Sequence, residues 1–406
     1  MGLFFQNKTE YKVQSISRAT WGRLIRNRQG AVLLIFLALT TLIAILGYLI
    51  TPDSTPYANE QILEIRLLKP LSKVEIASVK KNQQVIEHNI FHKMLFGQTS
   101  PFQPIAIEKY WFANDSIVLQ RYNEVAPYNI ERIHLADMVY AIKGEVQRKN
   151  NLCTFTTIDG QQMQISIADL QNSAKQQIRT RTYILGTDRY GRDVLSQLII
   201  GTRVSLSVGF VSVFIALLIG VFLGAIAGYY RGKIDDIIMW IINVVWSIPT
   251  LLLVIAISFA LGTGFWQIFI AIGLTMWVDI ARVVRGQVIS LREKEFVEAS
   301  KSLGFRNMTI IFKHILPNIV GTIIVVVAAN FASAILTEAS LSFLGIGVQP
   351  PMPSWGTMIK ENYGYIILDY AYLAIVPGIA IMLLVLCFML LGNVLRDVLD
   401  VKSDNN

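Results

Sequence analysis

Residues 31–50 read AVLLIFLALTTLIAILGYLI and contain no charged side chain. Twenty helical residues rise about 30 Å, which matches the hydrocarbon core of a bilayer. A secretory signal has a shorter apolar region that ends at a small-residue cleavage site. Here the apolar run is longer and Thr51-Pro52-Asp53 follows it, so we interpret it as a retained membrane helix rather than a signal peptide.

The composition of the 406-residue chain agrees with a membrane protein. Hydrophobic residues make up 53% and charged residues 16%, and the mean hydropathy is +0.49. Soluble proteins average roughly 45–50% hydrophobic and about 25% charged residues. The higher hydrophobic fraction and lower charged fraction of this chain exclude a disordered or fibrous protein. Two cysteines exclude a disulfide scaffold or a zinc-cluster protein. Cys153 lies in a polar region and Cys387 in an apolar run, so we expect no disulfide between them.

Five further apolar runs lie beyond residue 200, and we predict an α-helical integral membrane protein with six transmembrane helices. The six predicted spans are residues 31–50, 204–227, 237–261, 265–284, 319–343 and 372–391. Pro249 and Pro377 fall inside two spans and predict kinks. Gly220, Gly224 and Gly228 share one helix face, which predicts close contact with another helix, either within this chain or in a second subunit.

The distribution of Lys and Arg predicts the orientation of these spans. Basic residues concentrate before the first span, between the second and third, and between the fourth and fifth. We therefore expect the N-terminal segment 1–30 and the tail 403–406 in the cytoplasm, with residues 51–182 on the other side. The formal net charge of +8 is attributed to cytoplasmic loops rather than to nucleic-acid binding.

Residues 51–182 are predicted to form a small α+β insert between the first two spans. A capping box, Ser72-x-x-Glu75, precedes apolar residues at near-helical spacing and predicts a helix over about residues 73–95. Residues 105–112 and 117–122 predict strands. The role of this insert stays open.

Two short patterns in the insert were weighed for turn geometry and for metal binding. Asp159-Gly160 between the alternating runs 154–158 and 161–167 predicts a hairpin with a two-residue type I′ turn. His88 and His92 could share one helix face beside Glu87, but no third ligand is evident in the sequence. We therefore predict no metal site.

The loop between the fourth and fifth spans, residues 285–317, has internal structure. Residues 293–303 form a good amphipathic helix, and Gly304 stands where a left-handed residue ends a helix. Asn307 is predicted to cap a second helix over residues 308–315, and Leu316-Pro317 opens the next span. This geometry suits the transfer of motion from a cytoplasmic partner, and equally a helical loop on the lipid surface.

Several charged residues lie next to or within the predicted spans and are candidates for transport roles. Asp188, Arg192 and Asp193 precede the second span and could line a pathway or gate, or could stabilise each other. Glu338 could face a pathway or gate, or form buried hydrogen bonds. Asp279, Arg282 and Arg285 lie at the inner end of the fourth span, where snorkelling and the positive-inside pattern explain the two arginines, and we assign these arginines no transport role.

Several segments resemble the C-type permease subunit of dipeptide/oligopeptide ABC importers. Glu298-Ala299-Ser300, Gly304 and Ile315-Leu316-Pro317 resemble the "EAA…G…I-LP" signature of ABC importer permeases. The other similar segments are residues 185–194 (LGTDRYGRDV), 338–347 (EASLSFLGIG), 350–351 (PP), 354–356 (SWG) and 391–400 (LGNVLRDVLD). The resemblance covers about residues 15–50 and 183–402, in the order of the family.

The resemblance implies a type I permease core over residues 183–402 in a bacterial inner membrane. A second, homologous permease would complete the pathway, two cytoplasmic ATPases would bind residues 293–317, and an extracytoplasmic solute-binding protein would deliver a peptide. ATP and Mg would bind the ATPases, with no cofactor or catalytic residue in this chain. The sequence agrees, because Gly232-Lys233 is followed by Ile234 and no phosphate-binding loop is present.

The chain also departs from the family. Ser300 replaces the second alanine of the signature, Asn393 a common aspartate and Val401 a common proline, and the insert is larger than the group leads us to expect. The insert motivates an alternative, a membrane sensor or scaffold with a ligand-binding domain. An ion-driven transporter is a third hypothesis, although ionisable groups at the bilayer centre are scarce.

Overall fold

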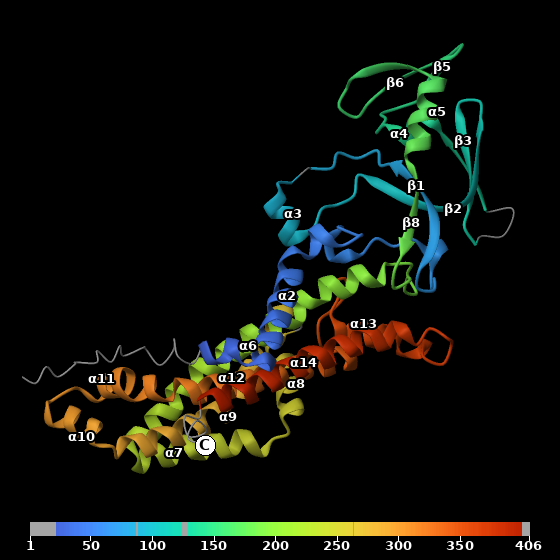
Figure 1. Cartoon of the computed structure of the whole chain (residues 1–406). Helices are drawn as coiled ribbons and strands as arrows, with labels where there is room; N and C mark the ends of the chain where they lie inside the picture. Colours follow the sequence, from blue (N-terminus) through green and yellow to red (C-terminus); the bar gives the residue numbers. More distant parts are fainter. Residues whose placement is uncertain (1–21, 87, 124–128, 263, 400–406) are drawn as a thin grey trace, which may run out of the picture.

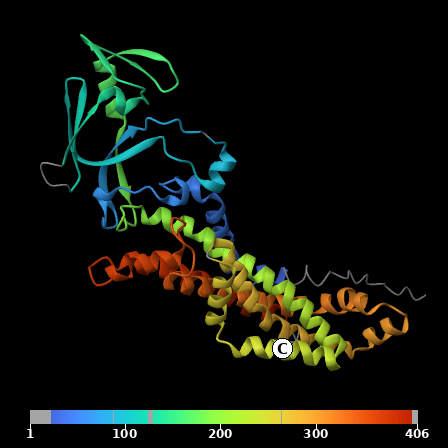
Figure 2. The same ribbon diagram turned by 180° about the vertical axis from the view of Figure 1, so that it is seen from behind.

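The computed structural model describes residues 22–86, 88–123, 129–262 and 264–399, and combines a helical bundle with a two-sheet insert. Figure 1 shows the insert at one end of the bundle and the α10–α11 region at the other, and the reverse view in Figure 2 shows the same separation. The predicted tail 403–406, most of the predicted segment 1–30, and Glu87 lie outside the described residues.

Among the described residues, five helices are long and apolar enough to cross a membrane, and a sixth span is counted if a bent helix pair is one span. The long helices are α2 (Arg28–Ile50), α6 (Val194–Tyr230), α9 (Phe265–Arg292), α12 (Leu316–Leu344, within the longer helix Asn307–Leu344) and α14 (Tyr372–Leu399). Pro377 lies inside α14, as predicted.

The predicted third span is not one kinked helix. Helices α7 (Gly232–Ser247) and α8 (Thr250–Leu261) meet at an angle of 96°. Pro249 is the residue before α8, and its lack of an N–H and its fixed φ stop the helix from continuing across this point. The prediction of a kink at Pro249 is confirmed, but the bend is large enough to divide the span into two separate helices.

The glycine face of α6 packs against α9 within this chain. A Cβ on Gly220 or Gly228 would lie 2.7 Å from a carbonyl oxygen of α9, and a Cβ on Gly224 would lie 2.5 Å from Ala281 O. Only hydrogen atoms fit at such distances, so these glycines allow the two backbones to touch. Of the two alternatives for this face, the structure shows internal packing.

The insert contains a five-stranded antiparallel sheet and a three-stranded sheet. The larger sheet has the order β4-β3-β2-β1-β8, and the smaller has the order β5-β6-β7. The strands are β1 (Ser72–Lys80), β2 (Phe102–Ala113), β3 (Ser116–Arg121), β4 (Ile130–His134), β5 (Gln147–Lys149), β6 (Leu152–Thr156), β7 (Gln162–Ser166) and β8 (Ile178–Tyr183). Helices α3 (Ile90–Phe96), α4 (Leu135–Val139) and α5 (Ile167–Gln176) complete the α+β insert.

The helix predicted over residues 73–95 is wrong. The structure has strand β1 there, followed by irregular chain and the short helix α3. Val74 and Ile76 are buried at a spacing of two, and β1 pairs with β2 on one side and β8 on the other. Tertiary pairing with two neighbours therefore overrides the local helical spacing. The predicted strands at 105–112 and 117–122 are confirmed by β2 and β3.

The predicted hairpin is confirmed, but its turn type is wrong. Strands β6 and β7 pair antiparallel with Thr156 opposite Gln162. Gly160 N–H donates to Thr157 O at 2.9 Å, and Thr157 N–H donates to Gln161 O at 2.9 Å. This is a three-residue loop in which only Gly160, with φ of +82°, is left-handed. Cys153 and Cys387 are free, as predicted.

Candidate functional site

The loop between α9 and α12 begins with the short helix α10 (Glu295–Ser302). Val297 and Ser300 are buried against the bundle, whereas Glu298 and Ala299 are exposed. The Ser300 hydroxyl donates to Phe296 O at 2.8 Å, so the serine that replaces the signature alanine satisfies its own polar group inside the helix. The helix therefore leaves the Glu298 and Ala299 side of the signature exposed.

Gly304 ends α10 in the geometry expected from the sequence. Its φ is +77°, its N–H donates to Lys301 O at 2.9 Å, and Phe305 N–H donates to Ser300 O at 3.2 Å. These two bonds are the pair that defines a Schellman motif. Gly304 thus turns the chain sharply and satisfies two helix carbonyls that would otherwise lack partners.

The second helix of this loop differs from its prediction. Asn307 is the first residue of α11 (Asn307–Thr309) rather than a cap, and its Oδ1 accepts from the Tyr229 hydroxyl at 3.0 Å. A π-helical segment, η3 (Ile310–Ile315), then runs directly into α12, so the predicted helix 308–315 and the span are continuous. Asn307 is therefore used to tie the loop to the end of α6.

Leu316 and Pro317 stand where the π-helical segment becomes α12. Leu316 N–H donates to Ile311 O, which is the wider i to i−5 spacing, and Pro317 lies in the first turn of α12. Because proline has no N–H and its ring crowds the preceding turn, a widened turn accommodates it without breaking the helix. Ile310, Ile311 and Ile315 are buried in the same core as α9, so the segment is held firmly.

An exposed apolar surface surrounds this turn. We call it the elbow surface and define it by Leu303, Phe305, Met308 and Phe312, which are 76%, 46%, 44% and 52% exposed. Sequence reasoning identified the turn but missed Phe305, Met308 and Phe312 as surface residues, because apolar residues in a short helix are ordinarily expected to face the core. Such a patch is typical of a protein interface.

The charged segment before α6 forms a buried network. Arg192 Nε donates to Asp188 Oδ2 at 2.6 Å, and Arg192 Nη2 donates to Glu361 Oε2 at 2.5 Å. Glu361 belongs to α13 (Trp355–Asn362), so the network joins two segments outside the long helices. Burial raises the pKa of Asp188, although Arg192 opposes that shift. These contacts match the alternative in which the charges stabilise each other, and a pathway or gate role stays a prediction.

Asp193 caps the N-terminus of α6. Its Oδ2 accepts from the Ser196 N–H at 2.8 Å and also from the Ser196 hydroxyl. Burial raises the pKa of Asp193, and the two bonds from Ser196 oppose this effect. Asp53 N–H donates to the Ser196 hydroxyl at 3.1 Å, so the cap also joins α6 to the start of the insert.

Glu338 is fully buried near the end of α12. The Ser342 hydroxyl donates to Glu338 Oε1 at 2.6 Å, and Val348 N–H donates to the Ser342 oxygen at 3.1 Å. The carboxylate therefore fixes the chain where it leaves α12 toward α13. This placement corresponds to the buried, hydrogen-bonded alternative, and a gate role stays a prediction.

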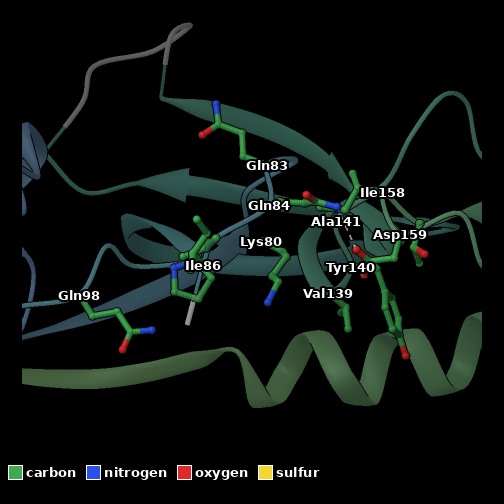
Figure 3. Close-up of a pocket in the computed structure, with 13 residues that line it drawn as sticks. Lys80, Gln83, Gln84, Ile86, Gln98, Val139, Tyr140, Ala141, Ile158 and Asp159 are labelled. Carbon is green, nitrogen blue, oxygen red and sulfur yellow. Dashed lines mark hydrogen bonds between the residues drawn. The ribbon is translucent and has the colours of Figure 1, made fainter. Parts of the chain in front are cut away.

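The insert contains a hollow of about 590 Å³ between the end of β1 and the β6–β7 turn. Figure 3 shows Gln84 directed toward Asp159, and the two side chains hydrogen-bond at 3.4 Å. His88 and His92 lie elsewhere and stack at 3.9 Å between ring centroids. In the part of the chain that the structure describes, no three His, Cys, Asp or Glu side chains gather as metal ligands would.

The bundle, the bent helix pair and the structured loop define a multi-span membrane protein with an exposed apolar surface at one end. Residues 220–402 match the family described as binding-protein-dependent transport system inner membrane component. The chain is 43% identical over 218 residues to a glutathione transport system permease of Pectobacterium atrosepticum, covering 54% of this chain and 72% of the relative. A dipeptide transport system permease of Alkalihalophilus pseudofirmus is 43% identical over 237 residues, covering 58% and 78%. An oligopeptide transport system permease of Bacillus subtilis is 39% identical over 223 residues, covering 55% and 73%.

The chain therefore belongs to the permease family of binding-protein-dependent ABC importers, as the motifs predict. Proteins of this family are transport subunits of the inner membrane. Among solved structures, an inward-facing MetNI methionine ABC transporter has a TM-score of 0.42 and 22% identity, covering 50% of this chain and 96% of that chain.

Proposed function

We propose that this chain is the peptide-translocating permease of an ATP-driven importer and forms half of its pathway. A second, homologous permease supplies the other half, two cytoplasmic ATPases bind the loop 293–317, and an extracytoplasmic binding protein delivers the peptide. The relatives named for dipeptide, oligopeptide and glutathione transport support the substrate class. ATP and Mg bind the partner ATPases, and this chain contributes no catalytic residue or cofactor.

The observation that carries the proposal is the construction of the elbow. Helix α10 exposes Glu298, a glycine turn follows, and a buried π-helical segment leads without interruption into α12. A displacement of α10 is transmitted to α12, because Ile310, Ile311 and Ile315 are buried in the core between them. The elbow surface supplies the apolar contact that a protein partner needs.

The opposite positions of the elbow and the insert support the proposed orientation. Helix α6 has 37 residues and is about 55 Å long, enough to cross a bilayer with its headgroups. Its first residue follows the insert, and its last turn holds Asn307 of the elbow through Tyr229. Since Lys and Arg concentrate on the elbow side, we place the elbow and both termini in the cytoplasm and the insert outside.

The test uses the whole complex, purified through a tag on this chain and reconstituted in liposomes. The proposal requires a second permease and two ATPases to co-purify and requires ATP-dependent uptake of a peptide with the binding protein present. Glu298→Lys, which reverses the exposed charge, and Gly304→Pro, which cannot adopt a φ of +77°, are expected to abolish uptake while membrane insertion is kept.

A matched control comes from the helix that precedes the elbow. Gly286 lies in α9, and a Cβ there meets nothing within 4 Å. Gly286→Ala is expected to leave uptake unchanged. Uptake that survives both elbow variants, or a purified complex without ATPase subunits, would contradict the proposed coupling.

A further inference from the structure

A polar hollow of about 250 Å³ lies in the membrane part of the chain, where the break between α7 and α8 faces α9 and α12. Hydroxyl groups and one carboxylate contribute to its lining, together with apolar side chains. The polar residues are Thr250, Thr275, Asp279, Ser333 and Thr337. A surface that faced only lipid would be lined by apolar side chains. The polar side chains found here therefore indicate contact with something other than lipid.

Asp279 is exposed at a depth where a carboxylate cannot face lipid. It lies fourteen residues after Phe265, the first residue of α9, which is about 21 Å along the helix. The hydrocarbon core is about 30 Å thick, so this position falls within it. Within the described ranges, Asp279 makes no hydrogen bond or ion pair. Ionisable groups at such depth face water, a substrate or a protein partner.

The neighbouring arginines hydrogen-bond to residues other than Asp279. Arg282 Nη2 donates to Asn243 Oδ1 at 3.0 Å, and its guanidinium lies 4.1 Å from the centre of the Trp246 ring. Arg285 donates through two nitrogens to Asp235 on α7. Both cations therefore contact side chains of α7, and the Asp279 carboxyl group is left exposed at the hollow.

Two residues of α12 that carry hydroxyl groups, Ser333 and Thr337, line the opposite wall of the hollow, and Ser340 extends the same helix face beyond it. Ser333 and Ser340 are exposed and Thr337 is half-buried between them, at spacings of four and three residues that share one helix face. The hydroxyls of Thr337 and Ser340 donate to carbonyl oxygens four residues earlier, at 2.8 Å each. Each oxygen keeps lone pairs to accept from water or from a substrate.

We propose that this hollow is part of the wall of the transport pathway and that Asp279 binds the ammonium group of the substrate in transit. The inference rests on the proposed function, because a peptide with a free amino end supplies that cation. The ligand class is a short peptide or another solute with a primary ammonium group. A hollow of about 250 Å³ is smaller than a typical ligand pocket. It can bind the amino end of a peptide transiently but does not enclose a whole substrate.

The first test measures the local field without any substrate. Ser333→Cys is made with Cys153→Ala and Cys387→Ala, so that one thiol is available in this chain of the assembled complex. Its rates of modification by a cationic and an anionic methanethiosulfonate reagent are compared with those in the same variant carrying Asp279→Asn. We expect modification of Cys at 333, with the cationic-to-anionic rate ratio about fivefold lower after Asp279→Asn.

An exposed apolar position outside the hollow supplies the control for access. Phe210 on α6 is 67% exposed and apolar, and Phe210→Cys is expected to remain unmodified. Equal ratios with and without Asp279, or a Ser333→Cys variant as unreactive as Phe210→Cys, would overturn the inference. Loss of the second permease on purification of Asp279→Asn, with an unchanged ratio, would show a subunit contact instead.

The second test measures uptake of one peptide with a free and with an acetylated amino end, both first shown to bind the binding protein. Asp279→Asn is expected to lower uptake of the free peptide about tenfold and to leave the acetylated peptide unaffected. Asp279→Glu is expected to restore most of the difference. Asp236→Asn removes an exposed charge from α7 outside the hollow and is expected to leave the ratio of the two peptides unchanged.

The outcomes separate the two proposals. Absence of ATP-dependent uptake of any peptide by the wild-type complex would overturn the proposed function and this inference with it. Peptide uptake by the wild type, with equal effects of Asp279→Asn on the free and acetylated forms, would overturn the role of Asp279 alone.

Discussion

Arg192 and Glu361 are 169 residues apart in sequence, yet the arginine Nη2 lies 2.5 Å from the glutamate Oε2. Their side chains are only 7% and 15% exposed, and Asp188, the other partner of Arg192, is 1% exposed. The bond holds α13 against the segment that enters α6. A buried charge of this kind becomes costly as soon as its partner is removed.

Arg192→Leu is therefore expected to destabilise the chain by about 3–5 kcal/mol, because it leaves the buried Asp188 carboxylate with backbone N–H partners but without its cationic partner. The midpoint of thermal unfolding of the purified complex in detergent measures the effect. Arg189→Leu is the matched control, since Arg189 is 38% exposed and lies 3.9 Å from Glu361. Its pair is expected to contribute about 0–1 kcal/mol. Similar shifts for the two variants would contradict the importance of the buried network.

Gly224→Ala tests the contact between α6 and α9. The new Cβ would lie 2.5 Å from Ala281 O and 3.0 Å from Ala281 Cα, so the helices must separate at a cost of about 1–3 kcal/mol. Gly286→Ala is the control, because it adds the same atom where nothing lies within 4 Å. It is expected to be neutral or to stabilise by about 0.5–1 kcal/mol. Thermal unfolding of both variants, measured side by side, checks the sign of each change.

A series at Gly304 tests the left-handed turn of the elbow. Because this position has a φ of +77°, a residue with a Cβ costs about 1–2 kcal/mol, least for asparagine and most for a β-branched residue. Hydrogen exchange of the α10 amides is expected to quicken in the order Gly304→Asn, Gly304→Ala, Gly304→Val. Exchange in the insert is the internal control and should not change. Equal exchange of α10 in all three variants would contradict the Schellman geometry.

Arg203 fastens the insert to the bundle. Its guanidinium donates to the α3 carbonyls of Met94 and Leu95 at 2.8 Å each, and to Ala44 O of α2 at 2.5 Å. The carbonyl oxygens in the last turn of α3 have no hydrogen-bond donors within the helix, and the Arg203 guanidinium donates to two of them. Arg203→Leu is expected to speed hydrogen exchange in α3 about 10- to 100-fold.

Arg179→Leu controls for the loss of a positive charge from the same part of the molecule, since Arg179 is exposed on β8. It should leave exchange in α3 unchanged. Unaltered protection of α3 after Arg203→Leu would show that the helix is held by other contacts.

Local patterns predict much of the bundle and of the elbow. A run of about twenty apolar residues has few stable alternatives to a membrane helix, because each backbone polar group in lipid must be satisfied within the segment. The turn at Gly304 was predictable for a similar reason, since the left-handed conformation strongly favours glycine. Pro249 predicted an interruption of the helix. The size of the bend between α7 and α8, 96°, depends on how α8 packs against α9 and α12.

The insert shows where local patterns fail. Residues 72–80 carry both a capping box and β-branched side chains, and the strand forms because β2 and β8 supply backbone partners on both sides. Likewise, the loop that contains Asp159-Gly160 has three residues rather than two, because Thr157 pairs with Ile142 as well as with Gln161.

The sequence by itself determined which segments enter the membrane, where the elbow turns and which family the chain belongs to, since these depend on neighbours along the chain. Only the tertiary structure decided that Arg192 meets Glu361, that the α6 glycines touch α9, and that Asp279 opens onto hydroxyls of α12. Contacts between distant segments depend on helix rotation and packing, and many pairings satisfy the same hydrophobic pattern. The packed bundle selects one of them and thereby decides which polar groups are buried in pairs and which are left exposed.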